Sequence, residues 1–118
     1  MENKRSKGGR YEQLAAKYLS DRGYRIISHN YRCHAGEIDL IAQESGYLVF
    51  IEVKYRADAR WGMPQEAVSI VKQRTIARVA GHYMMNHHIP ENTPVRFDVV
   101  AILDDCCQII QNAFEGSF

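Results

Sequence analysis

Apolar and polar residues follow first the period of a helix and then the period of strands along the first half of the chain. Residues 10–22 carry apolar positions three and four apart and end at Gly23, which predicts a helix closed by a glycine cap. Three strands are predicted from the alternating, β-branched and aromatic segments that follow, at residues 24–31, 36–43 and 47–55.

The second half of the chain predicts a helix followed by one or two strands, without an internal repeat. Residues 65–87 predict a long helix that ends near Asn86, and residues 56–64 before it predict a loop. Residues 95–103 predict a further strand, and residues 106–111 a short final one. The long helix is expected to bury one side, made of Ile70, Thr75 or Ile76, Val79 and Tyr83. We therefore expect one α/β domain over residues 1–118, with an αβββαβ core and a mixed sheet flanked by two helices.

A tight turn at Ser45-Gly46 fixes how the second and third predicted strands face each other. If these are the two loop residues, residues whose numbers sum to 91 lie opposite, and Asp39 faces Glu52. Lys54 lies two residues beyond Glu52 and shares its face. The reverse face is then apolar and is expected to be core, with Ile38, Leu40, Ala42, Val49, Ile51 and Val53. A slip of one residue would bury the charges, which favours this register.

Two carboxylates in this position repel each other, and a divalent cation would remove the conflict. Mg²⁺ and Mn²⁺ take oxygen ligands, commonly one or two carboxylates with water. Lys54 would orient a water molecule or stabilise charge on a phosphate. Glu12 shares a helix face with Ala15, Ala16 and Leu19, so it is expected to approach the same site if that face packs on the sheet.

Composition narrows the class of protein. The 118 residues are 46% apolar and 25% charged with a net charge of +1, which argues against a purely electrostatic nucleic-acid binder. No apolar run approaches a membrane span, and no apolar segment of a secretory signal follows the basic start. The three cysteines lack metal-site spacing, which indicates free thiols in the cytoplasm. Residues 1–9 are polar and contain Gly8-Gly9, and are expected to be a mobile lead-in.

Three segments carry a family resemblance: GRYEQLAAKYL, GEIDLIA and LVFIEVKYR. In this order they resemble the YraN family of small bacterial proteins and, more broadly, the restriction-endonuclease-like fold of PD-(D/E)xK nucleases such as archaeal Holliday junction resolvases. The resemblance implies that Asp39, Glu52 and the Val53 carbonyl bind the metal, and that Lys54 and Glu12 are catalytic. It also implies a polar residue on the long helix, Gln73 or Lys72. The usual proline before the aspartate is absent, because Ile38 stands there.

The function expected from these residues is hydrolysis of phosphodiester bonds, with DNA of branched or irregular structure favoured over RNA by analogy with the resolvases. Basic residues are expected to contact phosphates without reading the base sequence, namely Arg10, Arg32, Arg56, Arg60 and Lys72. A homodimer would supply two sites for two strands.

Two alternatives remain from the residues alone. One is a binding module with the same fold and weak or absent catalysis, which contacts nucleic acid or a protein. The other is a structural hairpin in which Asp39 and Glu52 pair with Lys54 and nearby arginines. A metal site built from His82, His87 and His88 is disfavoured, because His87 and His88 are adjacent and no fourth ligand accompanies them.

Overall fold

The computed structural model describes residues 4–56 and 68–116, with side chains from residue 9 onward and Arg56 by its backbone alone. Within these residues, two helices and five strands follow one another. In order they are α1 (Lys4–Asp21), β1 (Arg25–Cys33), β2 (Gly36–Glu44), β3 (Tyr47–Arg56), α2 (Ile70–Asn86), β4 (Val95–Leu103) and β5 (Cys106–Phe114).

The predicted helices and strands are present, but several of them begin or end at other residues than predicted. Helix α1 begins at Lys4, so residues 4–9 extend the predicted helix despite Gly8-Gly9. Helix α2 begins after Ser69, whose side chain accepts a hydrogen bond from the Lys72 N–H as an N-cap. Residues 65–67 of the predicted helix lie outside the described residues. The final strand runs on to Phe114.

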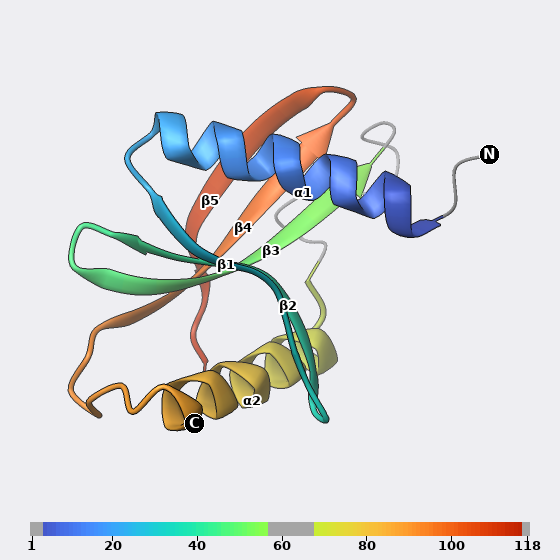
Figure 1. Ribbon diagram of the computed structural model, residues 1–118. Helices are drawn as coiled ribbons and strands as arrows, with labels where there is room; N and C mark the ends of the chain where they lie inside the picture. Colours follow the sequence, from blue (N-terminus) through green and yellow to red (C-terminus); the bar gives the residue numbers. More distant parts are fainter. Residues whose placement is uncertain (1–3, 57–67, 117–118) are drawn as a thin grey trace.

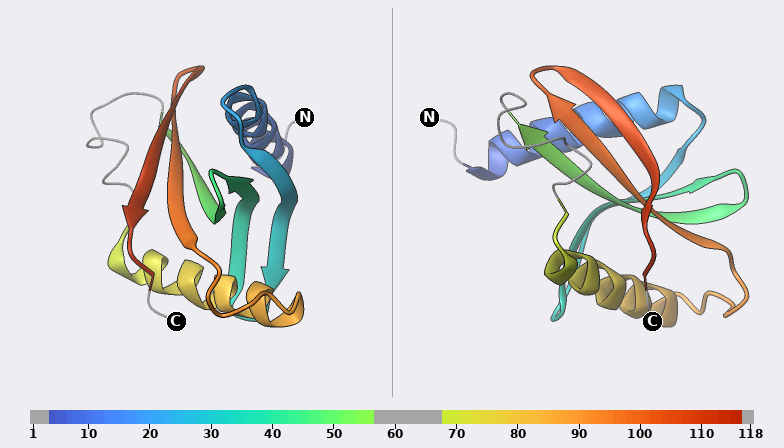
Figure 2. Two further views of the ribbon diagram at one scale, coloured as in Figure 1. Left: turned by 90° about the vertical axis from the view of Figure 1, so that its left-hand side faces the viewer. Right: turned by 180° about the vertical axis from the view of Figure 1, so that it is seen from behind.

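The strands form one sheet in the order β1-β2-β3-β4-β5. Strands β3 and β4 are parallel because α2 crosses between them, whereas the other neighbouring pairs are antiparallel. Helix α1 covers one face of the sheet and α2 the other (Figures 1 and 2). The expected α/β class, with a mixed sheet and two helices, is confirmed. Neither helix in the described part of the chain is long and apolar enough to cross a membrane.

The core is divided by the sheet into two apolar clusters. The α1-side cluster contains Ala15, Leu19, Tyr24, Leu40, Ala42, Val49, Ile51, Val100 and Ile102. The α2-side cluster contains Ile38, Ile41, Leu48, Phe50, Val68, Ile76, Ala77, Val79, Ala80, Tyr83, Phe97 and Val99. On α2, Ile76, Val79 and Tyr83 are buried as expected, but Ile70, the first residue of the helix, is 59% exposed.

The β2–β3 hairpin has the predicted register near its turn, although the ladder ends before the predicted Asp39–Glu52 pair. Ser45 and Gly46 both have positive φ, 51° and 83°, as a two-residue hairpin turn of type I′ requires. The pairs Glu44–Tyr47 through Leu40–Ile51 all sum to 91. The expected reverse face is present with one exception, because Ile38 lies in the α2-side cluster while Leu40 lies in the α1-side cluster.

The exception arises because β2 leaves β3 after Leu40. From there, residues 36–39 of β2 and the end of β1 form a two-stranded arm that bends toward α2 (Figure 1). At its tip Gly36 has φ +145°, and a Cβ added there would lie 2.8 Å from Thr75 Cγ2. The arm therefore packs closely on α2, and its inner residues join the α2-side cluster.

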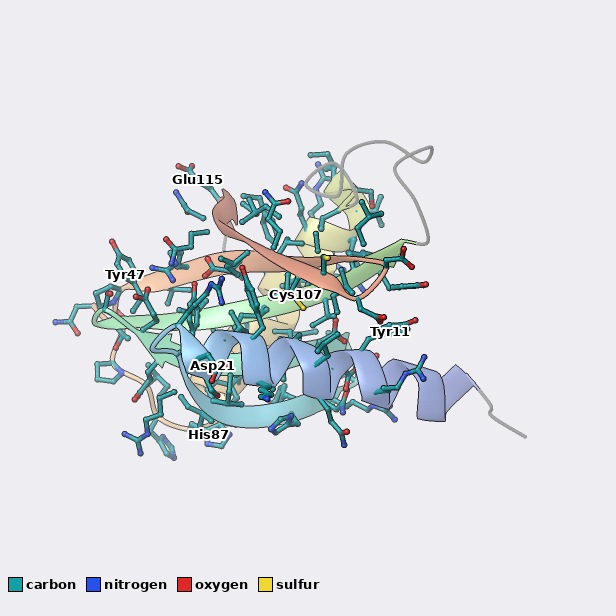
Figure 3. The ribbon with its side chains drawn as sticks, turned by 90° about the horizontal axis from the view of Figure 1, so that it is seen from above. Tyr11, Asp21, Tyr47, His87, Cys107 and Glu115 are labelled. Carbon is teal, nitrogen blue, oxygen red and sulfur yellow. The ribbon has the colours of Figure 1, made fainter. Side chains whose placement is uncertain are left out.

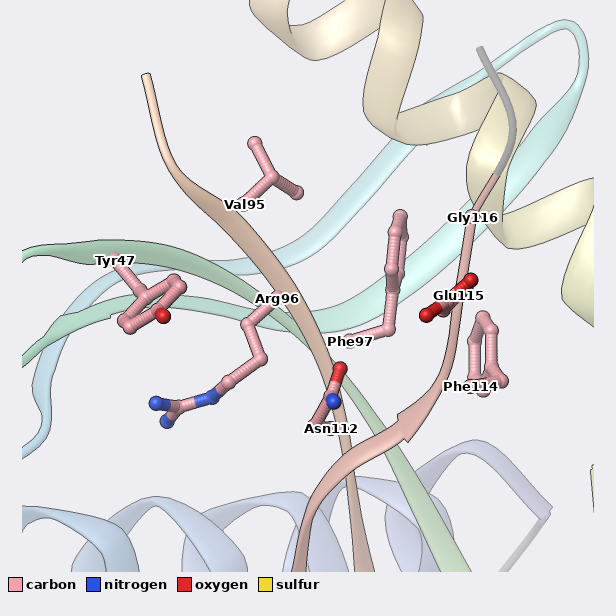
Figure 4. Close-up of a pocket in the computed structure, with 8 residues that line it drawn as sticks. All are labelled: Tyr47, Val95, Arg96, Phe97, Asn112, Phe114, Glu115 and Gly116. Carbon is pink, nitrogen blue, oxygen red and sulfur yellow. The ribbon is translucent and has the colours of Figure 1, made fainter. Parts of the chain in front are cut away.

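A buried polar network lies on the α1 side of β4. Asp98 is fully buried and accepts hydrogen bonds from Arg96 Nε and Nη2, both at 2.9 Å, and from the Tyr24 hydroxyl at 2.8 Å. Arg96 also donates to Glu44 at 2.8 Å, and its guanidinium lies 5.0 Å from the centre of the Tyr47 ring. Figure 4 draws the Arg96 and Tyr47 side chains. Burial raises the pKa of Tyr24 to about 12, so the hydroxyl keeps its proton and donates to Asp98. The network joins β4 to the β2–β3 hairpin and to the segment after α1.

Candidate functional site

The predicted site residues come together where β2 leaves β3. Beyond the Leu40–Ile51 pair the main chains separate, and the Asp39 side chain takes over the contact. Its Oδ2 accepts a hydrogen bond of 2.8 Å from the Val53 N–H. Because β2 leaves β3 here, the Val53 N–H has no main-chain partner on β2. The Asp39 carboxylate takes the place of that partner. The same bond holds the Asp39 carboxylate against β3, beside Glu52.

Asp39 and Glu52 form a buried carboxylate pair. Glu52 points to the α2 side of the sheet, with only 7% of its side chain exposed. Burial, and then the charge of Asp39, raise the pKa of Glu52 to about 7. Burial also raises the pKa of Asp39, although the Val53 N–H opposes the shift. The two carboxylates therefore repel each other when both are charged, as the hairpin register predicted.

Two lysines reach the same oxygen of Glu52. Lys54 Nζ, from the same strand, lies 3.7 Å from Glu52 Oε1, and Lys72 Nζ, from the first turn of α2, lies 3.8 Å from it. Gln73, the other candidate on this helix, donates instead through Nε2 to the Val68 carbonyl at 3.1 Å. Of the two α2 residues that the resemblance implied, Lys72 is the one that contacts the carboxylate pair.

Glu12 approaches Asp39 from α1, on the other side of the sheet. Burial raises its pKa, the Asn30 side chain lowers it through a hydrogen bond, and the neighbouring Asp39 raises it further. The preceding residue, Tyr11, projects from α1 toward the strands (Figure 3). Its ring stacks on that of Tyr55, with centroids 4.1 Å apart. Because Tyr55 follows Lys54 directly, this stack fixes α1 beside the end of β3 and brings Glu12 within reach of the pair.

The donor set suits a hard cation that retains water. Among the residues that the structure describes, no three His, Cys, Asp or Glu side chains are placed to hold a metal ion together. The oxygens available at the site are those of Asp39 and Glu52, with the main chain of Val53 beside them. Mg²⁺ is commonly held by one or two carboxylates and several waters, so the residues present fit this ion and Mn²⁺.

The basic residues expected to contact phosphates are placed unequally. The Arg10 guanidinium lies 5.4 Å from the centre of the Tyr11 ring, next to the site. Arg32 Nε donates to Glu37 at 2.8 Å, so its charge is offset on the exposed arm. The Arg56 side chain and Arg60 lie outside the described residues. Lys72 is at the site itself.

Replacing Glu52 by glutamine is expected to stabilise the metal-free protein. Because the pKa of Glu52 is raised, the folded protein holds a proton that the unfolded chain has released between about pH 4.5 and pH 7. Stability is therefore lost as pH rises through that window, and a neutral side chain avoids the loss. We expect the Glu52→Gln variant to gain about 1–3 kcal/mol at pH 8 and little at pH 4.5, measured by urea unfolding with chelator present.

Glu44→Gln is the matched control, with the opposite sign. Hydrogen bonds from Ser45 and Arg96 lower the pKa of Glu44, so its charged form stabilises the fold above the ordinary carboxyl pKa. The control should lose stability at pH 8. A Glu52→Gln variant less stable than wild type at pH 8 would contradict the carboxylate conflict.

Asn30 and the pair Arg96 and Asp98 are the residues of consequence that the sequence interpretation missed. Arg96 and Asp98 stand two residues apart in an otherwise apolar strand, which indicates a shared face and a buried ion pair. Asn30 gives no such signal, because its contact with Glu12 depends on how α1 crosses the sheet.

Comparison with known proteins identifies the family. A family model described as uncharacterised protein family UPF0102 matches residues 11–102. This chain belongs to the UPF0102 (YraN) family. The resemblance found in the sequence is thus confirmed at the level of the family, and the matched range contains Glu12, Asp39, Glu52, Lys54 and Lys72.

Relatives share most of their length with the chain. A UPF0102 protein of Lachnoclostridium phytofermentans is 50% identical over 114 residues, which cover 97% of each chain. One from Symbiobacterium thermophilum is 49% identical over 110 residues, 89% of this chain and 92% of the relative. One from Legionella pneumophila strain Corby is 39% identical over 112 residues, 93% of this chain and 95% of the relative. These names state no activity.

Proposed function

We propose that this protein is a metal-dependent nuclease that hydrolyses phosphodiester bonds in branched or otherwise irregular DNA. The observation that carries the proposal is the buried Asp39–Glu52 pair with a lysine 3.7 Å away on the same strand. A structural role alone would favour an apolar or neutral pair at this position, because the conflict between the carboxylates costs stability in the absence of a cation.

The arrangement of the elements supports a restriction-endonuclease-like fold. The order α1, β1–β3, α2, β4 agrees with the expected αβββαβ core, and β3 and β4 are parallel. The carboxylates lie where β2 and β3 separate, and the helices on the two faces supply Glu12 and Lys72 from opposite sides. A DNA phosphate bound at Glu52 would meet both lysines and the carboxylate pair together.

The division of roles follows from the charges. Asp39, Glu52 and the Val53 carbonyl would hold Mg²⁺ or Mn²⁺, which supplies an activated water and neutralises phosphate charge. Lys54 would stabilise negative charge that develops on the phosphate during attack. Lys72, 36% exposed at the mouth of the site, would hold a phosphate oxygen of the bound strand. Glu12, beside Asp39, would orient the attacking water.

We further propose that the protein acts in the cytoplasm, in keeping with its free thiols at Cys33, Cys106 and Cys107. Contacts to phosphates position DNA without reading its bases, so substrate structure rather than base sequence would select the site of cleavage. Cutting both strands of a junction would require two sites, which we assign to a homodimer.

The proposal is tested by incubating the purified protein with branched DNA, linear duplex DNA and single-stranded RNA, each with Mg²⁺, Mn²⁺ or chelator. We expect cleavage of branched DNA that requires the metal and that falls to background in the isosteric Asp39→Asn variant. Tight DNA binding without turnover beyond that of the variant would instead establish a binding module. Preferential cleavage of RNA would overturn the assignment of substrate.

A further inference from the structure

The faces of β1 and β2 are exchanged at one level of the arm, where Asn30 on β1 lies opposite Asp39 on β2. On one side of this point His29 pairs with Leu40, which lies in the α1-side cluster. On the other side Tyr31 pairs with Ile38, and both pack in the α2-side cluster. Residues 38 and 40 of a regular strand would share a face. Both strands therefore reverse their faces at the same level, where Asn30 stands opposite Asp39.

Asn30 has an unusual backbone conformation for a strand interior. Its φ is 53°, in the left-handed region, which costs a side-chain-bearing residue about 1 kcal/mol or more. Asparagine is among the residues that tolerate this region best. Strain of this kind persists only where surrounding contacts hold the residue in place, so the contacts of Asn30 decide what its conformation does.

The Asn30 side chain contacts one member of the candidate site. Its amide donates a hydrogen bond to the Glu12 carboxylate, which also borders Asp39. Asn30 is therefore adjacent to both acidic residues, through its side chain to Glu12 on α1 and through its strand position to Asp39 on β2. Glu12 is only half-buried, so without this donor its carboxylate is free to swing away from the repelling charge of Asp39.

We propose that Asn30 is a positioning residue of the nuclease site: its left-handed backbone aims the side-chain amide at Glu12 and holds that carboxylate beside Asp39. This role rests on the proposed function, because it matters for turnover only if Glu12 orients the attacking water. Partners of this kind fix the direction of a polar group that acts in the reaction, and their loss typically lowers activity by about 10- to 100-fold.

The test uses Asn30→Gly, which keeps access to the left-handed backbone but removes the amide. We expect kcat on branched DNA to fall by about 10- to 100-fold with KM within about twofold of wild type. Asn30→Asp, similar in shape but lacking the donor, should lose as much. In a double-mutant cycle, Asn30→Gly should cost nothing further once Glu12 is alanine.

Asn112→Gly is the matched control, since Asn112 is also exposed, also has φ 53° and lies on β5 away from the site. It should keep the wild-type kcat. If Asn30→Gly turns over like wild type, or if its loss adds fully to that of Glu12→Ala, the role assigned to Asn30 is wrong while the nuclease function stands. A wild-type protein without metal-dependent turnover overturns the nuclease function, and this role with it.

Discussion

Lys54→Ala is expected to lower kcat on branched DNA by about 10²- to 10³-fold at saturating Mg²⁺. The Lys54 ammonium lies 3.7 Å from Glu52 Oε1, and only 25% of its side chain is exposed. Its charge therefore acts where water screens poorly, against charge that develops only as the phosphate is attacked. The loss should appear in kcat, with KM for DNA little changed, in a single-turnover cleavage assay.

The Lys72→Ala variant distinguishes the role of Lys72 from that of Lys54, the other lysine at Glu52. Lys72 is 36% exposed and comes from α2, so we expect it to hold the bound strand, and its loss should raise KM more than it lowers kcat. Neither variant should weaken Mn²⁺ binding measured by calorimetry, because both lysines compete with a cation for the same oxygen of Glu52. If Lys72→Ala removes turnover while Lys54→Ala retains it, the roles assigned to the two residues are reversed.

The hairpin at the centre of the site could be predicted because its register depends only on residues of the hairpin itself. The two-residue turn at Ser45-Gly46 fixes the register, and the apolar alternation of β2 and β3 allows only one orientation of the charges. From these two facts Asp39 and Glu52 become neighbours without any knowledge of the remaining fold. The helical face that carries Glu12 follows in the same way from the spacing of Ala15 and Leu19, which are both buried.

Features that depend on contacts between distant segments could not be predicted. Strict alternation places Ile38 with Leu40, and only the packing of the arm on α2 reveals that the strand turns over between them. The choice between Lys72 and Gln73 depends on where α2 begins, and Ser69 sets that start as the N-cap. The position of Asn30 beside Glu12 likewise depends on where α1 crosses the sheet. Each of these features is decided by tertiary packing rather than by the pattern of one element.

Asp98→Ala is expected to destabilise the protein by about 3–5 kcal/mol, a large part of the free energy of unfolding of a domain of this size. Asp98 is fully buried and accepts hydrogen bonds from Arg96, the Tyr24 hydroxyl and the Asn112 N–H. Its removal would leave the Arg96 guanidinium buried with Glu44 as its remaining carboxylate. Urea unfolding at pH 7 measures the loss, and Asp98→Asn, which keeps the shape, provides a milder variant if the alanine protein does not fold.

The double variant Arg96→Met with Asp98→Leu measures what the ion pair contributes, on balance, to the free energy of unfolding. The single variant Asp98→Ala measures only the cost of leaving Arg96 without its partner. Replacing a buried ion pair by apolar side chains of similar size is often neutral, because two desolvation penalties disappear with the attraction. We therefore expect the double variant to recover most of the stability lost by Asp98→Ala. An equally unstable double variant would mean that the hydrogen bonds to Tyr24 and Glu44 carry the stability, and that the network holds β4 to the hairpin through them rather than through the ion pair.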